Sequence, residues 1–272
     1  MPWTSEHNIW LTKIENHLTT NDGKLVTLLE FKPDIVNGEI MSKWAKHFRN
    51  HYCFDTEIDF FRDGTGLSRR DYLLNTKFPS ESIGFGPGIR AGDFGEILIA
   101  DYLEFVLNHW VPRTRYGNKT IRDESTKGSD LIGFKIIDDS ESIQDVLTML
   151  EVKTQFSGNN TKPRLQNAID DSIKDELRKA ESLNAIKQRL FDKGKKIESN
   201  KIARFQNPID KPYTENYGAA ALFCESIFDN VVITDSSTSS HPKNDKLFLI
   251  VVKGSEMMSI VHKLYNLGAD EA

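Results

Sequence analysis

The stretch "GSDLIGFKIIDDSESIQDVLTMLEVKTQ", from Gly128 to Gln155, contains two apolar runs joined by a polar connector. The composition of the connector, "DDSESIQD", is typical of a hairpin turn, so we expect the two runs to form antiparallel strands. An acid stands at the head of the first run and a Glu-x-Lys at the tail of the second. Charged side chains at the ends of two buried strands need compensating partners, so this end of the hairpin is the first place to look for a site.

Alternation along the second strand predicts one polar face. Successive side chains in a strand point to opposite faces, so Glu151 and Lys153 project together with Gln155. Val152 then points the other way, into the core. The strand is therefore expected to carry an acid and a base side by side at its end.

The hairpin brings a second acid to the same place. A turn centred near Glu141 and Ser142 places Asp130 opposite Lys153 and beside Glu151. Opposed Cβ atoms in an antiparallel pair lie roughly 5 Å apart, and diagonal ones roughly 7 Å apart. Two carboxylates at this spacing can share one divalent ion.

These residue types indicate metal-dependent phosphoryl chemistry. Mg²⁺ is usually held by one or two carboxylates together with water and substrate phosphates, so Asp130 and Glu151 are candidate metal ligands. Lys153 beside the ion can orient or deprotonate a water and stabilise charge on a phosphate. The pattern predicts phosphodiester hydrolysis. The structural alternative is a cross-strand ion pair between Asp130 and Lys153, because charged residues make up 28% of the chain.

The rest of the chain predicts an α/β fold around this hairpin. We expect one principal domain over residues 86–272, preceded by an α/β elaboration over residues 1–85. The expected strands are residues 24–31, 111–116, 131–137, 146–156, 219–224 and 246–252, and the expected helices are residues 38–54, 96–110, 163–200 and 255–267.

Charge and cysteine content limit the class of protein. The two cysteines, Cys53 and Cys224, cannot build a disulfide framework, and "LFLIVV" is the longest apolar run. We expect a cytoplasmic protein that does not enter a membrane. A net charge of −5 argues against nucleic-acid binding through the whole surface. The basic segment 174–204 is either a solvated helix face or a face that follows phosphates.

Three motifs together carry a family resemblance. "GSD" followed by "EVK" resembles the PD-(D/E)xK nuclease motif, with Ser129 in place of the motif's proline. The expected order of helix, three strands, helix and strand is similar to the restriction-endonuclease-like core of that superfamily, a mixed sheet flanked by helices. With "GDFGEILIADYLE" added, the chain resembles the HamA family, the effector subunit of the Hachiman anti-phage defence system.

The resemblance implies specific roles and partners. It implies that Asp130 and Glu151 hold Mg²⁺ or Mn²⁺ and that Lys153 is the catalytic lysine of a deoxyribonuclease. It also implies DNA as the substrate and a HamB-like helicase as the partner that restrains the nuclease until it is released.

Glu96 is a further candidate catalytic residue. Members of the superfamily often carry an acid on the helix before the strands, and Glu96 occupies that position in "DFGEIL". Asp93 and Glu96 also have the spacing of a capping box, in which the second acid reaches back to the start of the helix. Both interpretations stay open at this point.

Two weaker patterns accompany the main one. His47 and His51, one helical turn apart and close to Cys53, have part of the spacing of a zinc site, although packing histidines are the commoner explanation. The glycine-rich segment 84–92 is expected to be a loop that enters the Glu96 helix, where Arg90 and backbone N–H groups could hold a phosphate.

Two other functions are compatible with the sequence. The chain could be a nonenzymatic DNA-binding or partner-regulating subunit that uses the same fold, with its acids purely structural. It could also cleave RNA with the same site. Convergence of Asp130, Glu151 and Lys153 on one point is the feature that favours the enzyme.

Overall fold

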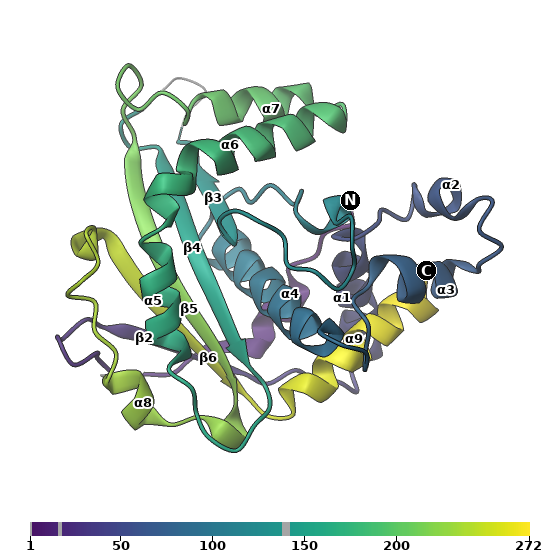
Figure 1. Ribbon diagram of the computed structural model, residues 1–272, viewed down its shortest axis with the longest axis horizontal. Helices are drawn as coiled ribbons and strands as arrows, with labels where there is room; N and C mark the ends of the chain where they lie inside the picture. Colours follow the sequence, from purple (N-terminus) through teal and green to yellow (C-terminus); the bar gives the residue numbers. More distant parts are fainter. Residues whose placement is uncertain (1, 16–17, 138–141) are drawn as a thin grey trace.

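The computed structural model describes residues 2–15, 18–137 and 142–272, and its centre is one six-stranded mixed sheet in the order β1-β2-β6-β5-β4-β3 (Figure 1). The four inner strands are parallel, and the two edge strands pair antiparallel with their neighbours. The strands are β1 (Leu11–Lys13), β2 (Val26–Phe31), β3 (Leu131–Lys135), β4 (Val146–Gln155), β5 (Thr214–Cys224) and β6 (Leu247–Gly254). The expected mixed α/β fold is confirmed.

Helices cover both faces of this sheet. In Figure 1, α5 lies against β4 and β5 on one side, α4 and α9 lie on the other, and α6 and α7 lie side by side at the top of the view. None of the helices in the described ranges is long and apolar enough to cross a membrane. The α-helices are α1 (Gly38–Asn50), α2 (Ile58–Arg62), α3 (Arg69–Tyr72), α4 (Gly86–Asp101), α5 (Arg164–Ser172), α6 (Asp175–Asp192), α7 (Lys196–Ala203), α8 (Asn230–Thr234) and α9 (Met257–Asp270).

The inner strands read as continuous apolar runs because both of their faces are buried. Alternate residues of β4 enter two different cores: Leu150 and Val152 pack on the α4 side, whereas Leu147 and Met149 pack on the α5 side. The prediction that Val152 points into a core is confirmed. The first 85 residues supply β1 and β2 of the same sheet, and α1 packs on α9.

The register of the β3–β4 pair differs from the prediction. Leu131 pairs with Leu150, so continuing the register by one residue places Asp130 opposite Glu151, not opposite Lys153. The prediction was wrong by two residues because the length of a connector does not set the register. A shift of two leaves every side chain on its expected face. The predicted turn position at Glu141 lies outside the described residues.

The expected strand at residues 111–116 is absent from the structure. Only Trp110 forms a bridge, with Phe134, and the chain then runs irregularly to a short 3-10 turn at Tyr116–Asn118. Pro112 cannot donate to a sheet ladder, and Arg113 and Arg115 point toward different groups of acids. Two strands, not three, therefore separate α4 from α5.

The glycine-rich segment is helical, contrary to the expected loop. Helix α4 begins at Gly86 with Pro87 in its first turn, and a Cβ at Gly86 would lie 2.3 Å from the Ser80 carbonyl oxygen. These residues therefore serve close packing. Arg90 is buried, donates to the Pro79 carbonyl at 2.7 Å and stacks on the Tyr265 ring, so it is not positioned as the phosphate ligand considered above.

The histidines with partial zinc spacing belong to a buried network around Asp101. His7 and His47 place their Nε2 atoms 2.8 Å and 3.0 Å from the Asp101 carboxylate, and Arg113 lies 2.6 Å from it. These two histidines and Asp101 are close enough to hold a metal. However, the Thr4 N–H donates to Nδ1 of His47, which leaves the His47 Nε2 proton for Asp101, and Arg113 supplies the cation.

The Asp101 network joins three separate segments: the N-terminal turn that carries His7, helix α1 and the chain after α4. His51 joins the network by accepting from Arg113 at 2.8 Å. Cys53 takes no part, because its thiol faces the Phe54 carbonyl. Although burial opposes them, the charge of Arg113 and the hydrogen bond from His47 hold the pKa of Asp101 well below its usual range.

We predict that Asp101→Asn strongly destabilises the protein. Removing one partner of a buried ion pair leaves the other charge uncompensated and typically costs about 3 kcal/mol or more. Denaturant unfolding should show this loss in the free energy of unfolding. Asp59→Asn is the control, because Asp59 pairs with Arg62 and Arg69 at the surface and its loss should change stability little. Equal effects of the two substitutions would contradict the prediction.

Candidate active site

The site forms where β4 continues beyond its edge partner. Strand β3 pairs with residues 146–150 of β4, whereas residues 151–155 pair only with β5. The backbone edge of β4 is therefore open on one side from Glu151 onward. Asp130, immediately before β3, uses this edge: its Oδ2 accepts from the Val152 N–H at 3.0 Å.

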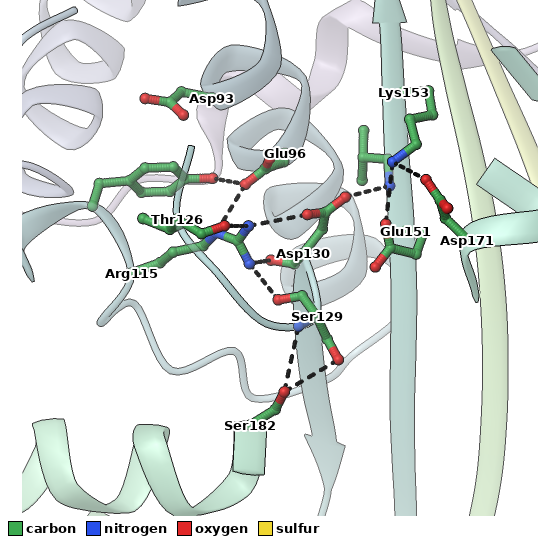
Figure 2. A network of polar contacts seen from close by, with 12 residues as sticks. Asp93, Glu96, Arg115, Thr126, Ser129, Asp130, Glu151, Lys153, Asp171 and Ser182 are labelled. Carbon is green, nitrogen blue, oxygen red and sulfur yellow. Dashed lines mark hydrogen bonds and ion pairs between the residues drawn. The ribbon is translucent and has the colours of Figure 1, made fainter. Parts of the chain in front are cut away.

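The three predicted residues converge on this edge (Figure 2). Lys153 Nζ lies 3.3 Å from Glu151 Oε2, and Asp130, Glu151 and Lys153 all line one cleft of about 1200 Å³. Lys153 also lies 2.9 Å from Asp171 on α5, a residue that the sequence did not single out. Although burial opposes it, the hydrogen bond that Lys153 donates to Asp171 and the charges of the other acids raise the pKa of Lys153, so its ammonium stays charged.

Arg115 connects the two sides of the site, and sequence reasoning missed it. Its guanidinium lies 3.0 Å from Asp130 Oδ1 and 3.2 Å from Glu96 Oε2. It also donates to the backbone carbonyls of Thr126, Ser129 and Asp130, which holds the segment before β3 in place. Figure 2 shows these contacts of Arg115, which connect α4 to the start of β3. Arg115 is thus the internal counter-ion of two of the candidate acids.

Glu96 lies in the interior of α4, so the capping-box interpretation is wrong. The helix begins at Gly86, and Asp93 instead pairs with Lys119 at 2.5 Å. Glu96 accepts from the Tyr116 hydroxyl at 2.7 Å. Burial raises the pKa of Glu96 to about 8 against the opposing charge of Arg115.

Close packing of α4 on β4 holds Glu96 near the open edge. A Cβ at Gly95 would lie 2.4 Å from the Thr154 side chain, so only glycine allows this approach. Glu96 therefore reaches the cleft from the α4 side of the sheet, while Glu151 faces the α5 side.

Two buried acids near the edge have carboxylate oxygens without partners. Glu151 is 3% exposed, and its Oε1 has no hydrogen-bond partner among the described residues. Burial and the charge of Asp130 raise the pKa of Glu151 to about 9. Asp175, the first residue of α6, is 0% exposed; neither of its oxygens has a hydrogen bond of good geometry in the described part of the chain, and the side chains of Ser129 and Glu151 are the polar groups that act on it.

Ser129, which stands in place of the motif's proline, attaches the site to α6. Its backbone N–H donates to Ser182 Oγ at 3.3 Å, a bond that proline could not make (Figure 2). The two hydroxyl groups are also 3.3 Å apart. Asp175 and Ser182 are two turns apart on α6 and share one helix face.

The cleft is also lined by cations that form no ion pair. Five cationic side chains of the cleft lining pair with no acid within the described ranges. Among them, the Nε of Arg164 is buried and has no partner there. The five are Lys127, Lys162, Arg164, Arg178 and Arg189. Other cations of the basic segment 174–204 have structural roles: Lys179 pairs with Glu215, and buried Arg204 lies 2.9 Å from Asp145. Only part of that segment therefore faces the cleft.

The donors at this site suit a hard divalent cation. Buried carboxylate oxygens that lack partners are costly unless a cation neutralises them, and carboxylate oxygens are the ligands that Mg²⁺ prefers. Glu151 offers one such oxygen. Asp130 lies beside it, with Arg115 and the Val152 N–H engaging its two oxygens. The residues present therefore fit the predicted metal.

The missed residues had only weak sequence signals. Arg115 lies in a segment that resembled a strand, and Asp171 and Asp175 fall in "DDSIKDE", a charged stretch typical of a solvated helix. Their roles depend on how α5 and α6 pack against the sheet, which short-range patterns do not specify.

Comparison with known protein families finds a match to the model of the family described as HamA, over residues 5–267 of the 272-residue chain. The matched range includes the whole cleft. A comparison with curated proteins finds no match.

We predict that Glu151 makes the metal-free protein less stable as pH rises. In the folded protein Glu151 keeps its proton up to a pKa of about 9, whereas a carboxyl with the ordinary value of 4.5 releases it much earlier. The folded state thus binds more protons between these values, and stability falls with rising pH.

Denaturant unfolding in EDTA should therefore show wild type losing stability relative to Glu151→Gln as pH increases through this range. Using the difference between the two proteins removes the contribution of other titrating groups. A difference that does not change with pH would show that Glu151 is not held protonated.

Proposed function

Because the chain belongs to the HamA family, whose members serve in Hachiman defence, we propose that it is a metal-dependent nuclease that degrades DNA as the effector of that system. The observation that carries the proposal is the convergence of Asp130, Glu151 and Lys153 at the open edge of β4. The family supports the defence role, and the geometry supports the chemistry. The test is purified protein with plasmid DNA, in the presence and absence of Mg²⁺ or Mn²⁺.

The proposed roles follow from the contacts. Asp130 and Glu151 would hold the metal, which when bound polarises a phosphoryl oxygen and activates water. Lys153 carries its charge next to Glu151 and Asp171, so it is placed to stabilise negative charge on the phosphate and to orient the attacking water. Glu96 and Arg115 would hold Asp130 from the α4 side.

The unpaired cations support a polyanionic substrate. Five side chains of the cleft hold positive charge without an ion-pair partner in the described chain, although the net charge of the protein is −5. A cleft of about 1200 Å³ also exceeds the roughly 300–1,000 Å³ of small-molecule pockets. Phosphates of a nucleic-acid backbone would satisfy these cations, and their contacts carry no base sequence.

A partner is part of the proposal. A nuclease that holds DNA by its backbone would also cut the DNA of its own cell, so its activity must be restrained until infection. The family supports a HamB-like helicase as that partner. Copurification of a helicase with the native chain would support this arrangement, and a chain that cuts DNA freely without any partner would contradict it.

One observation favours the second candidate, a nonenzymatic DNA-binding or partner-regulating subunit. Both oxygens of Asp130 already have protein partners, Arg115 and the Val152 N–H, as expected for an acid with a structural role. Glu151 distinguishes the two candidates, because its Oε1 has no hydrogen-bond partner among the described residues and would be available to a metal.

We predict that Glu151→Gln and Lys153→Ala each reduce metal-dependent cleavage by about 100-fold or more, because each removes a charge required in the transition state. The double variant should be little worse than either single variant, since the groups act as one unit. Glu215→Gln is the matched control: it removes a lysine-paired glutamate from the neighbouring strand, outside the cleft. Full cleavage by a folded Glu151→Gln protein would remove the basis of the nuclease assignment.

Glu96→Gln provides a separate prediction for the α4 side. We expect a large loss of cleavage with normal folding, because the variant replaces the acid that contacts Arg115 between α4 and Asp130. Single-turnover cleavage should show the loss. Activity near that of wild type would leave Glu96 with a structural role only.

We further predict that Arg178→Ala and Arg189→Ala weaken DNA binding by a similar factor for unrelated sequences. Each should reduce the slope of log affinity against log salt by about 1, because one phosphate contact is lost. Lys196→Ala on α7, outside the cleft lining, should leave the slope unchanged. Binding titrations at several salt concentrations with catalytically inactive protein would measure this, and equal slopes for all variants would argue against the cleft as the DNA path.

A further inference from the structure

The cleft has a part between α4 and α9 to which the roles above assign no residue. Its lining there includes Pro87 and Gly88 from the first turn of α4, and Met258 and His262 from α9. In Figure 1, α6 lies at the top of the view and α9 at the lower right, with α4 and β4 between them. None of the five unpaired cations of the cleft lies on α4 or α9. Of the two lining residues on α9, His262 has the polar side chain.

Arg90 fixes the hydrogen-bonding state of His262. Nη1 of Arg90 lies 3.2 Å from Nδ1 of His262. A guanidinium has donors and no acceptor, so Nδ1 of the imidazole must accept this hydrogen bond. A neutral imidazole that accepts at Nδ1 carries its proton on Nε2. His262 therefore has an N–H donor on the edge of its ring that faces away from Arg90.

The guanidinium of Arg90 is itself held on several sides. Its Nε donates to the Pro79 carbonyl at 2.7 Å, its plane stacks on the Tyr265 ring, and its Nη1 lies 3.2 Å from Glu81. Arg90 is 2% exposed. It therefore cannot reach a ligand in the cleft, but it holds the ring of His262 in a defined orientation.

His262 offers a neutral donor to the cleft. Burial lowers the pKa of His262 below its ordinary value of 6.5; the charge of Glu81 opposes this effect, and the charge of Arg90 reinforces it. The side chain is 27% exposed, and its Nε2 forms no hydrogen bond to a described residue. The N–H group of Nε2 is thus free to bind a ligand.

The start of α4 favours an anion in the same part of the cleft. Its first turn contains no acidic residue, no side chain caps it, and a Cβ at Gly88 would meet nothing within 4 Å. The start of a helix carries partial positive charge. The acid beside His262, Glu81, is paired with Arg90. A neutral N–H donor beside such a helix start suits a phosphate oxygen.

We propose that the DNA path continues past the metal site to α9, where His262 donates from Nε2 to a backbone phosphate. This inference rests on the proposed function, because it takes the cleft as the path of the DNA. From Arg90 to Glu96, α4 advances about 9 Å. That length corresponds to about three nucleotides of a strand that rises about 3.4 Å per nucleotide. The phosphate at His262 is therefore a neighbour of the phosphate at the metal site.

Binding of a fluorescently labelled DNA duplex in EDTA, at several salt concentrations, tests the proposal without cleavage. His262→Phe keeps an aromatic ring but removes the donor, so it should weaken binding by about 10-fold at every salt concentration. His262→Gln should bind nearly as well as wild type, because its amide N–H can donate from a similar position. Lys263→Ala is the control: Lys263 follows His262 on α9 but donates to the Ile35 carbonyl, outside the cleft lining.

The salt dependence separates a neutral donor from a cation. A neutral donor releases no counter-ion, so the slope of log affinity against log salt should be the same for His262→Phe as for wild type. Arg178→Ala should instead reduce this slope by about 1. A slope reduced by as much in His262→Phe would overturn the neutral donor.

Thermal unfolding of the same variants tests a purely structural role. His262→Phe should unfold near the temperature of wild type, because Arg90 keeps the Pro79 carbonyl and Glu81 as acceptors. Equal losses of DNA binding in His262→Phe and His262→Gln, together with a lowered unfolding temperature in both, would show that His262 supports the fold and would overturn the proposal.

The remaining results distinguish this proposal from the proposed function. If wild type binds the duplex and His262→Phe binds it equally well, the DNA path does not reach α9, and the nuclease proposal stands. If His262→Phe also loses a protein that copurifies with wild type, this part of the cleft contacts a protein partner instead. If wild type binds no duplex at any salt concentration, the proposed function fails, and the role of His262 fails with it.

Discussion

The backbone of β4 continues from Glu151 to Gln155 with a sheet partner on one side only, and the geometry of the site depends on this open edge. A strand edge exposes N–H groups that need acceptors, and Asp130 provides one from the residue just before β3. The same edge lets a carboxylate from the α4 side and a carboxylate from the α5 side approach one cleft. Had β3 started five residues earlier, its backbone would occupy the space in which these groups meet.

Some charged groups at this edge form ion pairs, and others have no partner within the described chain. Arg115 compensates Glu96 and Asp130 on one side, and Asp171 compensates Lys153 on the other. Between them, Glu151 retains a buried acceptor without a donor, and Arg164 in the cleft lining retains a buried donor without an acceptor, within the described part of the chain. Stable interiors avoid both situations, so their presence in one cleft indicates that the missing partners come from outside the chain. A metal ion and a phosphate backbone together would supply both kinds.

The sequence predicted those parts of the fold that short-range patterns determine. Alternation assigned the faces of Glu151 and Val152 correctly, and five of the six predicted strands are present. The predicted register of β3 against β4 was wrong by two residues, because a polar connector allows neighbouring alignments. An error of two residues leaves each side chain on its predicted face of the sheet. Glycines misled the prediction at α4, since at Gly86 and Gly95 they serve tight packing rather than a turn. Arg115 and Asp171 were missed, because their importance arises from contacts between distant segments.

The order of the strands has a consequence for synthesis of the protein. Strand β6 lies between β2 and β5, so the amino-terminal strands and the strands that carry the site have no common partner until residues 247–254 exist. Pairings this far apart in sequence form late, because a long loop must close first. A ribosome-bound chain that lacks β6 would therefore hold an incomplete sheet. The sheet that carries the proposed DNA-degrading site is therefore complete only after β6 has been made.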